Sequence, residues 1–332
     1  MKERKGISFV GNVLVDKVKF VEGYPQKGML ATIESETLGV GGAVPNTAIT
    51  LKTVDPTIEV KAFGKVGKDY EGEFVLNTMN KVGIDVSSIK YSEKAPTSYS
   101  DVITVKTTGE RTFFHNRGAN KEFSPSDINI ADLDCKILHA GYIMLLDGFD
   151  VLNEDGTSVM SNFLKDVQER GIKTSVDLVS EQSGDFKKLA KCAFKYCDYV
   201  IINEIESGLI AGINARDGQG KLDDNAVEQI LRALMAMGVK EKVVIHAPEK
   251  GYSLNSDGVI TAADSIKLPK GFIKGSVGAG DAFCAGCLYA IYNDYLDEDM
   301  LAFANLVAIN CLSQPDSVSG IVHKDKLKNV LN

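Results

Sequence analysis

The sequence has no apolar run long enough to span a membrane and no excess of positive charge. Its formal net charge is −8 at pH 7, which argues against a surface built for nucleic acid or anionic lipid. The charged N-terminus precedes a short apolar segment that Gly11, Asn12 and Asp16 interrupt, so this segment is interpreted as a strand and not as a signal peptide. We therefore expect a cytoplasmic protein with neither a nucleic-acid nor a membrane partner.

The sequence also lacks the His and Cys spacings of a zinc site. The six cysteines include one C-x-x-C pair, Cys284 and Cys287. No second pair stands at zinc spacing, and we expect both residues to be small, buried and apolar. The four histidines are scattered, without an H-E-x-x-H motif. These absences argue against a metalloenzyme built on His or Cys and fit a reducing cytoplasm.

A glycine-rich loop near the C-terminus lacks the Lys-Ser or Lys-Thr pair of a Walker A motif. Residues 274–283 read KGSVGAGDAF and lead into a helix predicted to begin near Asp281. Gly278 and Gly280 leave backbone N–H groups open to an anion, beside the positive end of the helix dipole. A carboxylate placed there suits a general base that accepts a proton while the N–H groups stabilise a phosphoryl group. A plain strand-to-helix turn is the alternative interpretation.

Strands and helices alternate along the C-terminal two thirds of the chain. The predicted strands are 137–139, 173–177, 199–202 and 243–245. The predicted helices are 157–170, 224–237, 281–292 and about 298–314. Alternating units of this kind favour a parallel sheet that is covered by helices on both faces.

The early strands follow a different pattern, with mixed polar and apolar faces. They lie at 17–21 and 31–38 and in a hairpin at 98–106 and 112–116. These segments suggest a small separate sheet made from two insertions, Val13–Leu38 and Ser98–Asn116. Asn12 and Asp16 follow the first strand, at the end where open α/β sheets place ligand-binding groups.

Three motifs occur in a characteristic order. Gly41-Gly42 with Asn46 comes first, then Asn203-x-x-Glu206, then Gly278-Ala279-Gly280-Asp281. Together they resemble the PfkB/ribokinase family of sugar kinases, from Gly11 to about Gly320. The resemblance implies an α/β fold, a three-layer α/β/α core with a mainly parallel sheet and a small β-sheet lid. The core would comprise residues 1–12, 39–97 and 117–332, and the lid residues 13–38 and 98–116.

The resemblance also implies roles for individual residues. Asp281 matches the catalytic base, and Gly278, Ala279 and Gly280 match the anion hole. The positions expected to bind the acceptor sugar are Asn12, Asp16, Gly41, Gly42, Asn46 and Asn120. Those expected to bind the nucleotide are Asn203, Glu206, His246, Gly251, Ser276, Gly278 and Gly280. Glu206 would bind Mg²⁺ through water, and ATP would be the phosphoryl donor. We also expect the lid sheet to form a homodimer, because an exposed sheet with mixed apolar and polar faces favours pairing with another chain.

The chain departs from the family pattern at three places. Gly275 and Ser276 replace the Asp-Thr that usually opens the late motif, which puts activation by a monovalent cation in doubt. Residues 246–251 stand where the family usually has a Thr-x-Gly-x-x-Gly nucleotide loop, and they keep only the last glycine of that motif. Tyr142 stands where some ribokinases carry an acid that contacts the sugar. These departures leave the identity of the sugar and the affinity for the nucleotide open.

The leading hypothesis is therefore ATP-dependent phosphorylation of a hydroxyl on a monosaccharide or related polyol. A nucleoside kinase is the alternative of the same fold, with Phe113, Phe114 and Tyr142 as candidates to stack on a base. A non-catalytic sugar or nucleotide sensor is a third, although a sensor has no need of the base Asp281. A dinucleotide-dependent oxidoreductase is disfavoured because the glycine loop lies so late in the chain.

Overall fold

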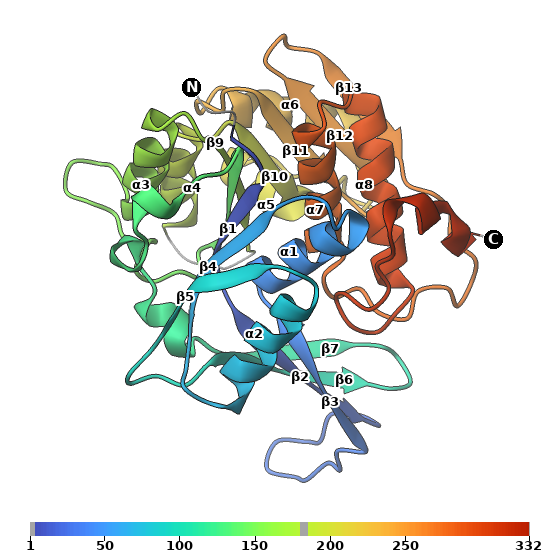
Figure 1. Ribbon diagram of the computed structural model, residues 1–332. Helices are drawn as coiled ribbons and strands as arrows, with labels where there is room; N and C mark the ends of the chain where they lie inside the picture. The colour runs from blue at the N-terminus through green and yellow to red at the C-terminus, as the bar shows by residue number, and fades with distance from the viewer. Residues whose placement is uncertain (1–3, 180–184, 332) are drawn as a thin grey trace.

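A mainly parallel sheet forms the centre of the computed structural model, which describes residues 4–179 and 185–331. Within these residues its nine strands are ordered β13-β12-β11-β10-β9-β8-β1-β4-β5 (Figure 1). Their bounds are Ile7–Gly11 (β1), Val60–Val66 (β4), Asp85–Tyr91 (β5), Ile137–Ile143 (β8), Lys173–Leu178 (β9), Tyr199–Asn203 (β10), Lys242–His246 (β11), Lys250–Asn255 (β12) and Ile260–Asp264 (β13). All neighbouring strands of this sheet are parallel except in the two pairs that β12 makes, with β11 and with β13.

Helices cover both faces of this sheet. On one face lie α1 (Ala43–Val54), α2 (Tyr70–Lys81), α7 (Ala279–Tyr292) and α8 (Asp297–Leu312). On the other lie α3 (Val159–Glu169), α4 (Phe186–Phe194), α5 (Glu204–Ala211) and α6 (Asp224–Met235). Short 3₁₀ segments lie at Gly118–Glu122, Pro125–Asp127, Ile130–Asp132 and Lys324–Leu331.

The alternation of side chains along β10 explains why there are two separate hydrophobic layers. Tyr199 and Ile201 pack in the layer with α1 and α7. Val200 and Ile202, one residue out of phase, pack in the layer with α3 and α6. A strand that is apolar at every position is therefore buried on both faces, as parallel sheets under two helical layers require. The expected three-layer α/β/α fold is confirmed.

A second, smaller sheet lies apart from the first (Figure 1). Its order is β3-β2-β6-β7, with bounds Ser35–Gly41 (β3), Leu14–Val21 (β2), Ser98–Val105 (β6) and Arg111–Asn116 (β7). The strand predicted at 31–38 instead begins at Ser35 and continues to Gly41, because its pairing with β2 runs on into the glycine cluster, where Gly41 faces Leu14.

Several elements were not predicted from the sequence, namely β5, β12, β13, α4 and α5. In the described part of the chain no helix is long and apolar enough to cross a membrane. All six cysteines are free, and Cys284 and Cys287 are buried in α7 as predicted.

Candidate active site

The glycine turn and α7 place Asp281 at the start of a helix. The helix begins at Ala279, two residues earlier than predicted, and Gly278 is its N-cap with φ 78°. A Cβ on Gly278 would lie 2.4 Å from Cβ of Ser317, so both conformation and space require glycine here. Asp281 is thus in the first turn, where backbone N–H groups have no acceptor inside the helix.

Asp281 is a buried carboxylate with two side-chain donors. Only 4% of its surface is exposed. The Tyr142 hydroxyl lies 2.7 Å from both carboxylate oxygens, and Asn46 Nδ2 donates to Oδ2 at 2.9 Å. Burial raises the pKa of Asp281 to about 6, against the opposing effect of the hydrogen bonds from Tyr142 and Asn46. The group is therefore ionised at neutral pH yet still able to accept a proton.

Asn46 joins the glycine turn to the C-terminal loop. Its Oδ1 accepts a hydrogen bond from Ser317 Oγ at 2.8 Å, while its Nδ2 donates to Asp281. Sequence reasoning assigned Asn46 to the acceptor and gave Tyr142 no part beside Asp281. Tyr142 as a partner of Asp281 and Ser317 as a partner of Asn46 were missed because no local pattern relates residues so far apart in the chain.

Asp16 lies on the small sheet within electrostatic reach of Asp281. Burial, followed by repulsion from Asp281, raises the pKa of Asp16 to about 7, although a hydrogen bond with Ser100 and the charge of Arg111 oppose the shift. A Cβ on Gly41 would lie 2.6 Å from Asp16 Oδ2, so this glycine leaves room for the carboxylate. The structure thus brings together Asp16, Gly41 and Asp281, which were assigned to the acceptor or to catalysis.

The other early site residues make contacts within the protein. A Cβ on Gly42, whose φ is 89°, would lie 2.6 Å from the Asn12 carbonyl oxygen. Asn12 Oδ1 accepts from the Tyr142 N–H at 2.9 Å, and its Nδ2 donates to Leu145 O at 3.0 Å. Asn12 therefore fixes the segment that carries Tyr142.

One polar atom of the Asn120 side chain has no hydrogen-bond partner within the protein. Asn120 Oδ1 accepts from the Val13 N–H at 3.1 Å, and its backbone N–H donates to Ser98 Oγ at 3.0 Å. Its Nδ2 is buried without a hydrogen-bond partner. A buried donor of this kind costs free energy until a ligand or water accepts from it, which fits the expected contact with an acceptor hydroxyl.

Asn203 and Glu206 form the N-terminal cap of α5. Asn203 Oδ1 accepts from the N–H groups of Ile205 and Glu206 at 2.9 and 2.8 Å. Glu206 Oε2 accepts from the Asn203 N–H at 3.2 Å, which completes a capping box. The motif therefore has a clear structural role in starting the helix at the carboxyl end of β10.

His246 lies beside the glycine turn, whereas Gly251 lies in the core. His246 ends β11 in register with Asn203, and a Cβ on Gly280 would lie 3.3 Å from its Cε1. Gly251 is buried inside β12, where an added Cβ would meet Phe283 and Leu301 at 3.2 and 3.3 Å. Ser276 is exposed in the turn, and its carbonyl accepts a long 3.4 Å bond from the Ala279 N–H.

A third acid, Asp177, belongs to the same region and was not predicted as a site residue. It is buried near the end of β9, and its pKa is raised well above the usual value by burial, then by repulsion from Glu206 and Asp281. Its place at the carboxyl end of a strand was a usable signal. Within the described residues no three His, Cys, Asp or Glu side chains could bind a metal ion together. Mutually repelling carboxylates nevertheless suit a divalent cation bound partly through water.

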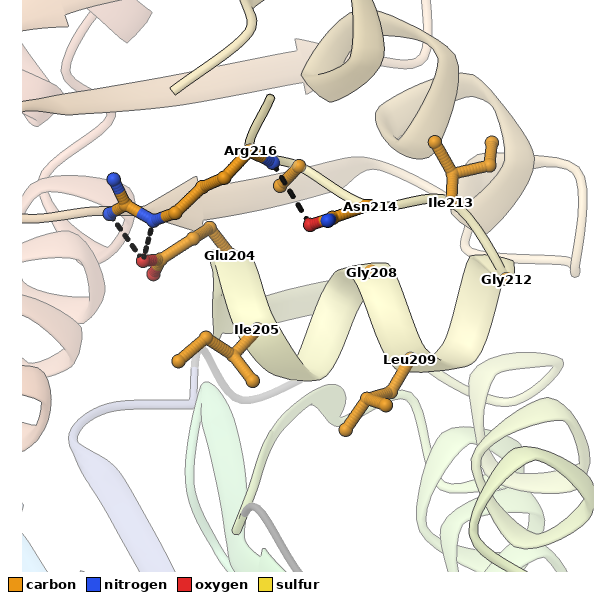
Figure 2. A pocket seen from close by; sticks show the side chains of 9 residues that line it. Glu204, Ile205, Gly208, Leu209, Gly212, Ile213, Asn214 and Arg216 are labelled. Carbon is orange, nitrogen blue, oxygen red and sulfur yellow. Dashed lines mark hydrogen bonds and ion pairs between the residues drawn. The ribbon is translucent and has the colours of Figure 1, made fainter. Parts of the chain in front are cut away.

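A separate pocket is lined by α5 and by the loop that follows this helix (Figure 2). It is lined by Glu204, Ile205, Gly208, Leu209 and residues 212–216. Figure 2 shows Arg216 reaching to Glu204, at 2.6 Å. Arg216 also binds Glu249 at 2.8 Å, so it ties the loop after β11 to the helix that Asn203 caps.

Comparison with known proteins identifies the family. The model of the pfkB family of carbohydrate kinases matches residues 4–323. The chain belongs to this family. Ribokinase of Schizosaccharomyces pombe is 24% identical over 314 residues, 90% of this chain and 89% of that protein. The 5-dehydro-2-deoxygluconokinase of Clostridium beijerinckii is 25% identical over 285 residues, 83% and 80% of the two chains.

The fold of this pfkB-family protein is also that of a solved ribokinase. Arabidopsis thaliana ribokinase, complexed with ribose and ATP, superposes with a TM-score of 0.80 at 17% identity, covering 99% of each chain. Family membership supports kinase activity toward a carbohydrate or nucleoside. It leaves the roles of single residues to be argued from the geometry.

Proposed function

We propose that the protein transfers the γ-phosphoryl group of ATP to a hydroxyl of a monosaccharide or related polyol, with Asp281 as the base. The observation that carries this proposal is the environment of Asp281. It is a buried carboxylate with a pKa of about 6, in the first turn of α7 beside a glycine turn. A proton acceptor and an anion-binding helix N-terminus are thereby adjacent, as phosphoryl transfer to an alcohol requires.

In the proposed reaction an acceptor hydroxyl donates its proton to the Asp281 carboxylate. The freed oxygen forms a bond to the γ-phosphorus, and the bond from that phosphorus to the β–γ bridging oxygen breaks, releasing ADP. Backbone N–H groups at Gly278, Ala279 and Gly280 stabilise the charge on the phosphoryl oxygens. Tyr142 and Asn46 orient the carboxylate through their hydrogen bonds.

The expected nucleotide side lies at the carboxyl ends of β10 and β11. ATP as donor is supported by the similarity to a ribokinase that was solved with ribose and ATP. Mg²⁺, when bound, would neutralise charge on the phosphates. Glu206 and Asp177 are the carboxylates whose mutual repulsion such a cation would relieve.

We further propose that the small sheet, residues 13–38 and 98–116, is a lid over the acceptor. Register supports this, because Asp16 pairs with Ser100 and Ser100 with His115, which places these side chains on one face of the sheet. Val102 and Phe113 follow on the same face. A cover over the acceptor would exclude water and limit wasteful hydrolysis of ATP.

The nucleoside alternative has one observation in its favour. Phe113 is on the face of the small sheet that carries Asp16, and 55% of it is exposed, so it could stack on a base. Phe114 is on the opposite face, and the Tyr142 hydroxyl is engaged by Asp281.

Turnover of ATP with a panel of aldoses, ketoses, polyols and nucleosides tests the proposal directly. Faster turnover of a sugar than of any nucleoside is expected. The reverse order would establish the nucleoside alternative, and no turnover with any acceptor would contradict a kinase.

A further inference from the structure

Arg111 is a cation that the proposed mechanism does not use. It is the first residue of β7, and its Nη1 is fully buried without a hydrogen-bond partner. Burial is also the largest influence on its pKa, which it lowers, while the charge of Asp16 raises it. A buried donor on a guanidinium is costly unless something accepts from it. The protein itself therefore leaves a donor of Arg111 without an acceptor.

The guanidinium is on the face of the small sheet that carries Asp16. Arg111 pairs with Thr104, two residues from Val102, and Val102 pairs with Val18, two residues from Asp16. Alternation along strands puts all of these side chains on one face. One cavity confirms the placement, since it is lined by Asp16, Val18, Val102 and Arg111 together with residues 315–319 of the C-terminal loop.

Arg111 also lies against the start of the glycine turn. A Cβ on Gly275 would lie 2.9 Å from Arg111 Nη2 and 2.6 Å from the Pro315 carbonyl oxygen. The missing side chain at 275 therefore makes room for the guanidinium. The Arg111 side chain thus lies between the small sheet and the loop that leads to Asp281.

Asp16 does not supply a full counter-charge to Arg111. Its pKa is raised to about 7, so near neutral pH it is protonated about half of the time. Val18, Phe20 and Val102 line the cavity on the sheet side, and Asp316 lines it on the side of the C-terminal loop. In such surroundings an anion that binds Arg111 gains more than it would in water.

We propose that Arg111 binds an anionic group of the acceptor, either a carboxylate or a phosphate ester. Arg111 lines one cavity with Asp16 and another with Gly275 and Ser276. The apolar lining and the buried Asp16 of the first cavity favour the acceptor over the nucleotide as the source of this anion. A guanidinium can bind either group through two parallel hydrogen bonds. This inference rests on the proposed sugar kinase function and narrows its substrate class to acidic sugars.

The test compares matched ligand pairs by calorimetry. D-Gluconate is paired with D-glucitol for a carboxylate, and D-fructose 6-phosphate with D-fructose for a phosphate. Wild-type protein should bind one acidic member at least tenfold more tightly than its neutral counterpart. In Arg111→Gln this ratio should fall toward one, and Arg111→Lys, which keeps the charge but not the fork, should give an intermediate ratio. Which pair shows the effect distinguishes the carboxylate from the phosphate.

Lys19→Gln is the matched control. Lys19 is also a cation of the small sheet, but its side chain lies on the opposite face from Asp16. It forms ion pairs with Asp101 and Glu36. Its loss should leave the acid preference unchanged. Equal binding of acidic and neutral members by the wild type would overturn the inference. So would an acid preference that survives in Arg111→Gln, or a loss confined to ATP binding.

Turnover with ATP separates this inference from the function on which it rests. Phosphorylation of neutral sugars without any acid preference would contradict the role of Arg111 and leave the kinase proposal standing. An acid preference that depends on Arg111, without phosphoryl transfer to any acceptor, would contradict the kinase and leave the anion site standing.

Discussion

Burial raises the pKa of Asp281, and hydrogen bonds to its carboxylate oppose that rise. The first prediction is that Asp281→Asn lowers kcat by about 10²–10⁴-fold, the usual contribution of a general base, while ATP binding changes little. Calorimetry with ATP and initial rates with the best acceptor measure the two effects. A turnover number equal to that of the wild type would show that another group accepts the proton.

The same variant should remain well folded. Because the folded-state pKa of Asp281 is raised to about 6, its contribution to stability is present at low pH and is lost as pH rises through that value. Replacing the carboxyl by an amide removes this loss at neutral pH. We therefore expect no decrease in melting temperature, so that lost activity cannot be attributed to unfolding.

The hydrogen bond from Tyr142 lowers the pKa of Asp281, against the larger effect of burial, which raises it. The Tyr142 hydroxyl donates to the charged carboxylate, so Tyr142→Phe should raise the pKa of Asp281. Hydrogen bonds to charged groups contribute about 1.5–3 kcal/mol, which corresponds to roughly one to two pKa units. The acidic limb of the kcat–pH profile, near pH 6 in the wild type, should move to higher pH by about that amount. An unchanged limb would mean that Asp281 is not the titrating base.

Asp16 is expected to act on the acceptor alone. Leaving an acceptor hydroxyl without its partner costs about 1–3 kcal/mol, so Asp16→Ala should raise the KM for the sugar about tenfold or more and leave the KM for ATP unchanged. Steady-state kinetics with each substrate varied in turn measure both constants. An effect on the ATP constant instead would move Asp16 to the nucleotide side.

At the scale of the element, the glycine turn explains a fourth prediction, that potassium has little effect on turnover. Gly275 has no side-chain oxygen to bind a cation, and Arg111 Nη2 lies close to where such a side chain would begin. A neighbouring positive charge opposes a second cation. Turnover at fixed ionic strength, with potassium exchanged for tetramethylammonium, measures this. A many-fold loss of activity without potassium would show that backbone carbonyls form a cation site by themselves.

The elements that could be predicted are those whose signals are local. The turn at Gly278, the helix after it and the strand pattern of β10 are marked by glycine, by an N-terminal acid and by unbroken apolar runs. The separate small sheet was also foreseen, from strands with one polar face. In contrast, β12 was missed although its residues alternate, because the loop before it was interpreted only as a nucleotide loop.

The arrangement of the site could be predicted only in part. Asp281, Asn46 and the early glycines stand in recognisable motifs, but Tyr142, Ser317 and Arg111 do not. Tyr142 and Ser317 reach the site because β8 and the C-terminal loop end beside the first turn of α7, and Arg111 because β7 pairs with β6. Such contacts depend on the order of strands in the two sheets, which no single segment of sequence encodes.

At the scale of the whole molecule, the site draws on segments from both ends of the chain. The small sheet supplies Asp16, the first βα unit supplies Asn46, and α7 supplies Asp281. The contacts of Asn46 with Asp281 and Ser317 join α1 to α7 and to the C-terminal loop, and Ser317 Oγ donates to the carbonyl oxygen of Val40 in β3. A substrate that bound Asp16, Asn46 and Asp281 would also hold the small sheet against the core, so closure and binding should occur together.

The last prediction is a homodimer formed through the small sheet. Its outer strands, β3 and β7, are edges of the kind that pair with other chains. Beside them, Met29 and Leu30 are 69% and 88% exposed, and exposed apolar side chains that cluster mark interaction surfaces. Sedimentation velocity at micromolar concentration should therefore show a dimer, and Leu30→Lys should shift it toward monomer. Leu296→Lys, at an apolar residue that precedes α8 and is 76% exposed, is the control and should leave the dimer intact. A wild-type monomer at these concentrations would contradict the dimer while leaving the proposed lid in place.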